Sequence, residues 1–259
     1  MKRYGIIPAR FGSSRFPGKP LADIAGKPLV VRTLEAAKRA AALDEVFVAT
    51  DDRRIADAVE AHGGVAVMTP AELPSGTDRI SVAADAFARS RGGDGYADDD
   101  ILVNIQGDEP LTDPALVDAL VRILADDPGR DMATATVPIA DAADIASKNV
   151  VKTVVDRNGN ALYFSRSAIP CLRDGDPAPG AAPYLRHIGI YAYRGGFLRR
   201  YTAEPQCALE KAEKLEQLRA LWMGAKIGTV VADGEAGVGV DTPEDAARVE
   251  RILRESGRL

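Results

Sequence analysis

Short apolar runs alternate with amphipathic stretches through the first half of the chain. The apolar runs are compact and predict strands at 4–7, 46–50, 65–68 and 101–105. The stretches between them carry apolar residues at helical spacing and predict helices at 29–41, 55–61, 80–88 and 116–124. Apolar strands that alternate with helices are typical of a parallel sheet with helices on both faces.

The pattern changes in the second half of the chain. Strands are predicted at 132–139, 150–155, 161–165, 188–193 and 227–231. The Asp-Arg-Asn-Gly-Asn sequence at 156–160 has the composition of a hairpin turn, so we expect an antiparallel insertion on the parallel core. Residues 209–222 predict an amphipathic helix, and Pro243 is expected to start a closing helix. The predicted fold is α/β: a mostly parallel, Rossmann-like sheet with helices on both faces and a smaller antiparallel insertion.

Composition narrows the class of protein. The chain has 259 residues, enough for one large domain or for a domain with a smaller lobe. Its net charge of −5 argues against non-specific binding to nucleic acid or to a membrane, since both favour a basic surface. The apolar runs fall short of a membrane span, and the N-terminus lacks the apolar core of a signal peptide. Cys171 and Cys207 are too few for a disulfide framework, so we expect a cytoplasmic protein.

A loop rich in Gly, Ser and Pro follows the first predicted strand. Pro8 is expected to end that strand, because proline has no N–H to donate to a neighbouring strand. The loop carries Arg10, Arg15 and Lys19 and contains no acidic residue. Small residues let backbone N–H groups approach an anion, and the cations add charge-assisted hydrogen bonds. A strand, such a loop and a helix in this order predict a phosphate site.

The loop does not match either of two common phosphate motifs. Gly12 and Gly18 are one residue further apart than in a Walker A loop, and Pro20 stands where that motif has Ser or Thr. The dinucleotide fingerprint Gly-x-Gly-x-x-Gly is also absent after the strand. From the residues alone, an ordinary loop with solvated cations therefore stays open as the alternative.

Two aspartates follow apolar stretches and precede predicted helices. Asp108 comes after the strand at 101–105, at the end of a strand where open α/β sheets bind ligands. Asp241 precedes Thr242 and Pro243. Two such carboxylates could share Mg²⁺ with substrate phosphates. The alternatives are a plain turn aspartate for Asp108 and a helix cap for Asp241.

Other polar residues have a structural and a functional interpretation. The segment 75–79, Ser-Gly-Thr-Asp-Arg, looks like a helix N-cap. His187 is one of only two histidines, and a single histidine is more often structural than functional. Glu216 and Gln217 would lie on a solvated helix face if they had no other role.

Several strings resemble a known family. Residues 6–20, the Gln-Gly-Asp-Glu-Pro at 106–110 and the Gly-Val-Asp-Thr-Pro at 239–243 closely resemble the sugar nucleotidyltransferases that activate keto-deoxy sugars with CTP. The resemblance is to the 3-deoxy-manno-octulosonate (Kdo) cytidylyltransferases in particular, and it extends from Ile6 to the closing helix. Ser14, Asp78 and Cys171 depart from the residues expected there. The resemblance implies a single nucleotidyltransferase domain, with 1–139 and 224–259 as the nucleotide-binding core and 140–223 as the sugar-binding and dimerisation lobe.

The resemblance also implies residue roles. Catalysis would use Arg10, Lys19, Asp108 and Asp241, with Mg²⁺ held by the two aspartates. The nucleotide would contact Pro8, Ala9, Arg10, Ser13, Lys19, Ser75, Gly76, Arg79 and Gln106. The sugar acid would contact Arg15, Gln106, Arg166, Arg173, His187, Tyr191, Glu216 and Gln217.

The implied reaction transfers CMP from CTP to the anomeric hydroxyl of Kdo, releases pyrophosphate and gives CMP-Kdo for lipopolysaccharide synthesis. A homodimer is the expected assembly. Two alternatives stay open: the same chemistry on another sugar acid, such as 8-amino-Kdo or a nonulosonic acid, and a nucleotide-binding protein without turnover. The aspartates argue against the second, because binding alone does not require a metal-activated nucleophile.

Overall fold

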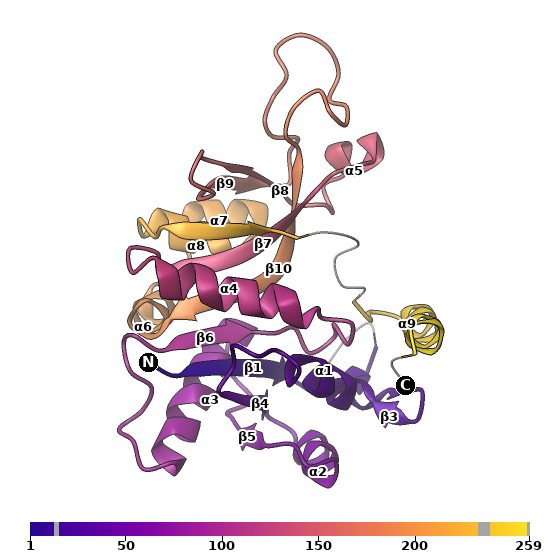
Figure 1. Cartoon of the computed structure of the whole chain (residues 1–259), viewed down its shortest axis with the longest axis vertical. Helices are drawn as coiled ribbons and strands as arrows, with labels where there is room; N and C mark the ends of the chain where they lie inside the picture. Colours follow the sequence, from indigo (N-terminus) through magenta and orange to yellow (C-terminus); the bar gives the residue numbers. More distant parts are fainter. Residues whose placement is uncertain (13–15, 233–238, 258–259) are drawn as a thin grey trace.

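The structure, a computed structural model, describes residues 1–12, 16–232 and 239–257 (Figure 1). Its strands are β1 (Arg3–Ala9), β2 (Asp23–Ile24), β3 (Lys27–Pro28), β4 (Glu45–Thr50), β5 (Ala66–Met68), β6 (Ile101–Asn104), β7 (Met132–Pro138), β8 (Lys152–Val155), β9 (Ala161–Ser165), β10 (Leu185–Arg194) and β11 (Ile227–Val231). Its helices are α1 (Leu29–Ala37), α2 (Arg53–Ala61), α3 (Gly76–Ser90), α4 (Pro114–Asp126), α5 (Ala142–Ala146), α6 (Gly195–Ala203), α7 (Ala208–Glu213), α8 (Gln217–Trp222) and α9 (Pro243–Glu255), with a 3-10 turn η1 (Lys19–Leu21).

One large sheet organises the described part of the chain. Its main path runs β11-β7-β10-β6-β1-β4-β5, and β8 and β9 extend it from β10. The pairs β1–β4, β1–β6, β4–β5 and β7–β11 are parallel. The pairs that involve β10, β8 and β9 are antiparallel. The predicted fold class, a mostly parallel α/β sheet with a smaller antiparallel part, is confirmed.

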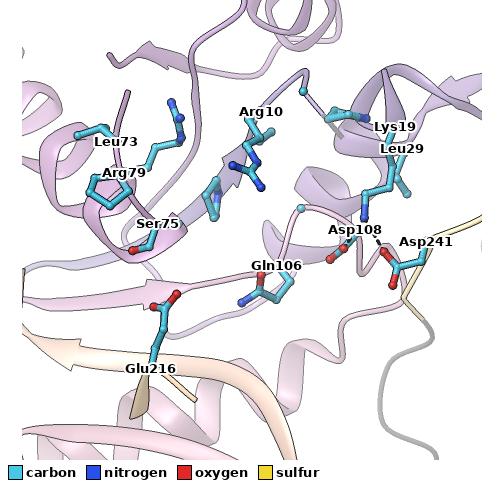
Figure 2. A pocket seen from close by; sticks show the side chains of 17 residues that line it. Arg10, Lys19, Leu29, Leu73, Ser75, Arg79, Gln106, Asp108, Glu216 and Asp241 are labelled. Atoms are coloured by element: carbon cyan, nitrogen blue, oxygen red, sulfur yellow. Dashed lines mark hydrogen bonds and ion pairs between the residues drawn. The ribbon is translucent and has the colours of Figure 1, made fainter. Parts of the chain in front are cut away.

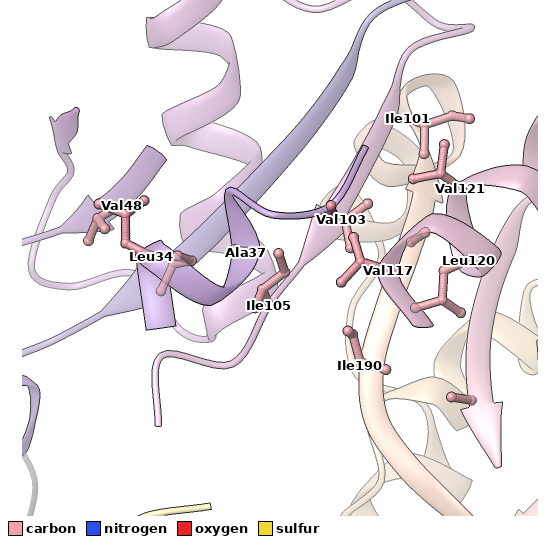
Figure 3. Close-up of a cluster of buried hydrophobic side chains, with 14 of the residues drawn as sticks. Leu34, Ala37, Val48, Ile101, Val103, Ile105, Val117, Leu120, Val121 and Ile190 are labelled. Carbon is pink, nitrogen blue, oxygen red and sulfur yellow. The ribbon is translucent and has the colours of Figure 1, made fainter. Parts of the chain in front are cut away.

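Helices cover both faces of this sheet because side chains alternate along each strand. Val103 of β6 packs with Leu34 of α1 and Leu120 of α4 in one buried cluster (Figure 3). Its neighbour in sequence, Leu102, belongs to a second cluster that includes Leu218 of α8. The α3 and α6 helices also contribute to this second cluster, so the two cores lie on opposite faces of the sheet.

The first strand is longer than predicted. The expectation that Pro8 ends it is wrong, since β1 continues to Ala9 and Pro8 pairs in register with Ala49. The carbonyl oxygen of Ile6 accepts a hydrogen bond from the N–H of Ile105, which follows β6. The backbone nitrogen of Pro8, two residues further along β1, points to this same edge of the strand. The pairing with β6 ends at Ile6, and the missing N–H of Pro8 therefore breaks no ladder bond.

The strand β10 belongs to the main sheet although it lies within the predicted lobe at 140–223. It runs antiparallel between β7 and β6. One edge of β10 is divided: Leu185 and Arg186 pair with β8, whereas the stretch from Tyr191 onward pairs with β6. A register irregularity between Ile188 and Tyr191 separates the two parts. The apolar pattern of a strand predicts its burial but not its neighbours, so the sequence did not show this placement.

Two predicted helices differ in extent. The single helix expected at 209–222 is wrong: Lys214 adopts the left-handed conformation, with φ of 55°, and separates α7 from α8. With this break, Leu215 lies in the core, whereas Trp222 at the end of α8 is 63% exposed. The helix expected at 29–41 ends at Ala37. The N–H groups of Arg39 and Ala40 make tighter turn bonds to Ala36 and Ala37, and those of Ala41 and Ala42 donate to the carboxylate of Asp118 on α4.

No helix in the described residues is both long enough and apolar enough to cross a lipid bilayer.

Candidate active site

A cavity of about 440 Å³ lies at the carboxyl ends of β1 and β6. The strands β4 and β5 continue the sheet on one side of β1 while β6 lies on the other. Open α/β sheets bind ligands at such a switch point. The cavity brings together predicted site residues from segments far apart in sequence (Figure 2), namely Pro8, Ala9, Arg10, Lys19, Ser75, Gly76, Arg79, Gln106, Asp108, Glu216 and Asp241.

The α3 helix starts at the wall of this cavity. Ser75 is its N-cap and accepts a hydrogen bond from the backbone N–H of Asp78, so the capping role predicted for this segment is confirmed. Gly76 follows at the cavity wall, against Pro8. The first turn of a helix presents backbone N–H groups and a positive dipole end, which suit a polar or anionic ligand.

Arg79 lines the cavity, but its guanidinium is hydrogen-bonded to other residues of the protein. The side chain is buried, and its Nη2 donates to Oδ2 of Asp51 at 3.1 Å. Its Nη1 donates to the hydroxyl of Thr69 and to the carbonyl of Pro70. These bonds fix the position of the α3 start relative to the end of β4.

An ion-pair cluster in the cavity joins three predicted catalytic residues (Figure 2). The ammonium of Lys19 donates to Oδ2 of Asp108 at 2.6 Å and to Oδ1 of Asp241 at 3.0 Å. Burial acts to lower the pKa of Lys19, but the hydrogen bonds and charges of the two carboxylates outweigh it, so the pKa is raised. Lys19 is therefore held as a cation between two aspartates.

Backbone contacts bring the two aspartates to one place. The N–H of Val240 donates to the carbonyl of Asp108 at 2.8 Å, which docks the segment before α9 onto the end of β6. Gly107 permits a close approach to β1, because a Cβ there would lie only 2.7 Å from the carbonyl oxygen of Pro8. The alternative that Asp241 caps α9 is excluded, since Thr242 is the N-cap and forms a capping box with Asp245.

The pair Asp108 and Asp241 suits a hard divalent cation. Both side chains offer carboxylate oxygens, the donors that Mg²⁺ prefers, and one cation, the Lys19 ammonium, already bridges them. Across the described residues, three or more His, Cys, Asp or Glu side chains do not gather as a metal cluster. The pair fits an ion that takes its remaining ligands from phosphates and water.

Glu109, next to Asp108, is also electrostatically perturbed. Burial, and then the charge of Asp108, raise the pKa of Glu109 to about 7. The sequence offered no signal for this, because the burial of a residue in a turn depends on the segments packed around it.

A second cavity, of about 520 Å³, adjoins the first. Gly76, Gln106 and Glu216 line both cavities. The second cavity also contains the predicted sugar-binding residues His187, Tyr191 and Gln217. It lies where β8 and β6 part along the edge of β10, and Gln106 donates from Nε2 to the carbonyl of Gly189 in that gap.

Two side chains of β10, His187 and Tyr191, present neutral groups to this cavity. Burial lowers the pKa of His187 to about 3, so the ring is uncharged at neutral pH, and its Nε2 lies 3.0 Å from the hydroxyl of Thr134. Burial is also the main cause that raises the pKa of Tyr191. The Tyr191 hydroxyl donates to Oε1 of Gln217 at 3.4 Å. Positive charge comes instead from Arg186 and Lys214, which also line the cavity.

The cytidylyltransferase family matches residues 4–227, most of the chain. The chain belongs to the cytidylyltransferase family. It is a nucleotidyltransferase enzyme, as the sequence strings predicted.

Full-length relatives agree with the family assignment. This cytidylyltransferase is 49% identical over 258 residues to the 3-deoxy-manno-octulosonate cytidylyltransferase of Bdellovibrio bacteriovorus, which covers 99% of this chain and 100% of the relative. The solved structure of a CMP:2-keto-3-deoxy-manno-octonic acid synthetase complexed with CTP superposes with a TM-score of 0.88 at 42% identity, covering 99% of this chain and 100% of that one. The predicted family resemblance is confirmed.

A more distant solved structure shares the fold alone. The 4-diphosphocytidyl-2C-methyl-D-erythritol synthase gives a TM-score of 0.64 at 15% identity and covers 97% of this chain and 98% of that one.

Two predicted sugar-binding arginines lie elsewhere in this cytidylyltransferase. Arg166 is absent from the lining of both cavities, and its guanidinium donates to the carbonyls of Glu213 and Lys148. Arg173 is exposed in the long loop before β10, which projects from the body of the protein (top of Figure 1). Ser13 and Arg15 lie outside the described residues.

The structure adds cavity residues that the sequence analysis did not select. Thr77, Asn104 and Asn149 line the second cavity. Thr77 donates to Oε2 of Glu216 at 3.2 Å and so links α3 to the start of α8. A polar residue at the end of an apolar strand, as Asn104 is, was the signal available in the sequence.

Proposed function

We propose that this cytidylyltransferase transfers CMP from CTP to the anomeric hydroxyl of Kdo. The observation that carries the proposal is the junction of two cavities, one with a cation–carboxylate cluster and one with polar side chains and the two cations Arg186 and Lys214. Gly76, Gln106 and Glu216 line both cavities, so two ligands bound there would be neighbours. The names of the relatives support CTP and Kdo as these ligands.

CTP fits the first cavity in this proposal. Arg10 and Lys19 would hold the triphosphate, with charge-assisted hydrogen bonds to its oxygens. The small residues Ala9, Ser75 and Gly76 would bind the nucleoside, where Pro8 and the start of α3 provide backbone groups. Arg79 supports this wall through its ion pair with Asp51.

Kdo fits the second cavity. His187, Tyr191, Glu216 and Gln217 offer hydrogen-bonding groups for the sugar hydroxyls. Arg186 and Lys214 supply positive charge in the lining, which suits the carboxylate of a sugar acid.

The reaction is a displacement at the α-phosphate. The anomeric oxygen of Kdo forms a bond to that phosphorus while the bond to the β-phosphate oxygen breaks, the hydroxyl loses its proton, and pyrophosphate leaves. Asp108 and Asp241 would hold Mg²⁺, which when bound lowers the pKa of the hydroxyl and offsets phosphate charge. Arg10 and Lys19 would stabilise the negative charge on the leaving pyrophosphate.

Pyrophosphate release tests this function. The protein would be assayed with Mg²⁺ and each of CTP, ATP and GTP against Kdo, 8-amino-Kdo and a nonulosonic acid. We expect turnover with CTP and Kdo far above all other combinations. Equal rates with the three nucleotides would show that the cavity wall at Ser75 and Gly76 does not select the base. Binding of CTP without turnover of any sugar acid would favour a non-catalytic protein.

The assembly and the location of the protein stay predictions. Leu162 of β9 and Trp222 of α8 are 60% and 63% exposed, and their elements pack against each other, which supports a homodimer through this region. Light scattering on the protein and on a Trp222→Glu variant would test it. Cys171 and Cys207 are both free, which supports a reducing, cytoplasmic environment.

A further inference from the structure

Asn104 ends β6 with a buried amide oxygen that lacks a partner. The residue is 3% exposed and lines the second cavity. Its Oδ1 makes no hydrogen bond with any residue that the structure describes. A buried acceptor without a partner lowers stability, so such groups in folded proteins call for a specific explanation.

A complementary donor lies in the same cavity. Asn104 stands directly opposite Tyr191 in the antiparallel pair β6–β10, so the two side chains share one face of the sheet. The Tyr191 hydroxyl donates to Oε1 of Gln217, which occupies the oxygen of that amide. The Nε2 of Gln217 has no partner among the described residues, although Gln217 is also 3% exposed.

The chemistry of the two groups limits what they can bind. A carboxylate or phosphate has no hydrogen to donate to Oδ1 of Asn104. A sugar hydroxyl both donates and accepts, so it can satisfy an amide oxygen, an amide N–H, or one of each. Tyr191, which faces Asn104 across the strand pair, and the neutral ring of His187 beside it carry no charge, which agrees with a neutral ligand group in this part of the cavity.

We propose that Asn104 is a further substrate-binding residue, whose amide oxygen accepts a hydrogen bond from a hydroxyl of the sugar acid next to the amide of Gln217. This inference rests on the proposed function, because it takes the second cavity to be the sugar site. The unpaired oxygen makes Asn104 a specificity determinant: an analogue without that hydroxyl would leave a buried acceptor unsatisfied.

The substitution Asn104→Leu tests the inference with two readouts. Leucine has a similar size and removes the buried polar group, so the ligand-free protein should keep or raise its melting temperature. The KM for Kdo should rise about three- to tenfold, as for the loss of an uncharged hydrogen bond, while the KM for CTP stays within about twofold. A merely structural asparagine would give the opposite pattern.

Asn160 supplies the matched control. It is also buried, at 8% exposure, but its side chain is bonded to Arg130 and Asp156, and it lines neither cavity. Asn160→Leu should lower the melting temperature because it removes the side-chain hydrogen bonds to Arg130 and Asp156, and it should not change the KM for Kdo.

A series of deoxy analogues of Kdo identifies the hydroxyl. The analogue that lacks it should bind the wild type and Asn104→Leu equally, whereas the other analogues keep the difference. An unchanged KM for Kdo in Asn104→Leu, or a melting temperature lowered by several degrees, would overturn the inference. Absence of wild-type turnover with Kdo would overturn the proposed function instead. In that case the KM values of the wild type and Asn104→Leu are compared with the sugar acid that is turned over. The melting temperatures of the two proteins still test whether Asn104 has a structural role.

Discussion

Gln106 donates a hydrogen bond of 2.8 Å from Nε2 to the carbonyl oxygen of Gly189. The carbonyl lies in the stretch of β10 where pairing with β8 has ended and pairing with β6 has not begun. Gln106 thus takes the place of a strand neighbour and separates the two cavities that it lines. We therefore expect this one side chain to position both proposed substrates relative to each other.

Replacing this amide should impair the joining of the two substrates. In Gln106→Glu the shape is kept, but a carboxylate oxygen faces the Gly189 carbonyl, so two acceptors repel each other. We expect kcat/KM to fall at least tenfold, equivalent to about 1.4 kcal/mol. Steady-state kinetics with CTP and Kdo varied in turn would measure this. Wild-type values would show that the bond to Gly189 does not position either substrate.

Removal of the Lys19 ammonium should lower the rate but raise the affinity for Mg²⁺. In Lys19→Met the rate should fall roughly ten- to hundredfold, because a charge-assisted bond to the triphosphate of about 1.5–3 kcal/mol is lost. Binding of Mg²⁺ without nucleotide should become tighter, since Asp108 and Asp241 lose the cation that bridges them. Calorimetric titration with Mg²⁺ alone measures the second effect.

Arg10→Ala is the matched control for Lys19. Arg10 lines the same cavity, but the carboxylate pair keeps its bridging lysine in this variant. We expect a similar loss of rate, of roughly ten- to hundredfold, with a normal melting temperature and unchanged Mg²⁺ binding. Wild-type kinetics in both variants would mean that this loop does not touch the triphosphate.

Asp241 and Thr242 are adjacent but should respond differently to substitution. Asp241→Asn removes a negative charge from the proposed metal pair, so we expect a loss of several hundredfold in rate at low Mg²⁺ with an unchanged melting temperature. Thr242→Ala removes the cap of α9 and should cost about 1 kcal/mol of stability with little change in rate. Near-normal pyrophosphate release by Asp241→Asn would remove Asp241 from the site.

His187 should make the protein less stable in acid. Its pKa is about 3 in the fold and about 6.5 when unfolded, so between these values the unfolded chain binds the extra proton. The free energy of unfolding should therefore fall as the pH drops below 6.5, by up to about 1.4 kcal/mol per pH unit from this group.

Urea denaturation of the wild type and His187→Gln at pH 7 and pH 5 would measure the contribution of His187. Glutamine does not titrate, so the wild type should lose about 2 kcal/mol more than the variant over this interval. Parallel losses in the two proteins would show that the ring is not held neutral.

The sequence by itself determined most of the elements and the chemistry of the site. Hydrophobic periodicity is a local property, so the pattern at 101–105 or 116–124 predicts β6 and α4 without knowledge of the rest of the chain. The capping residue Ser75 is likewise set by its near neighbours. The strings that carry Lys19, Asp108 and Asp241 indicated the family for the same reason, because each is a short continuous segment.

Only the tertiary structure decided which of these segments meet. Asp108 and Asp241 share one ammonium because the segment before α9 docks on the end of β6, and this depends on contacts between distant parts of the chain. The position of β10 in the sheet, the break at Lys214 and the unpaired oxygen of Asn104 have the same origin. Whether a buried polar group is satisfied depends on every element that surrounds it, and a single segment of sequence does not contain that information.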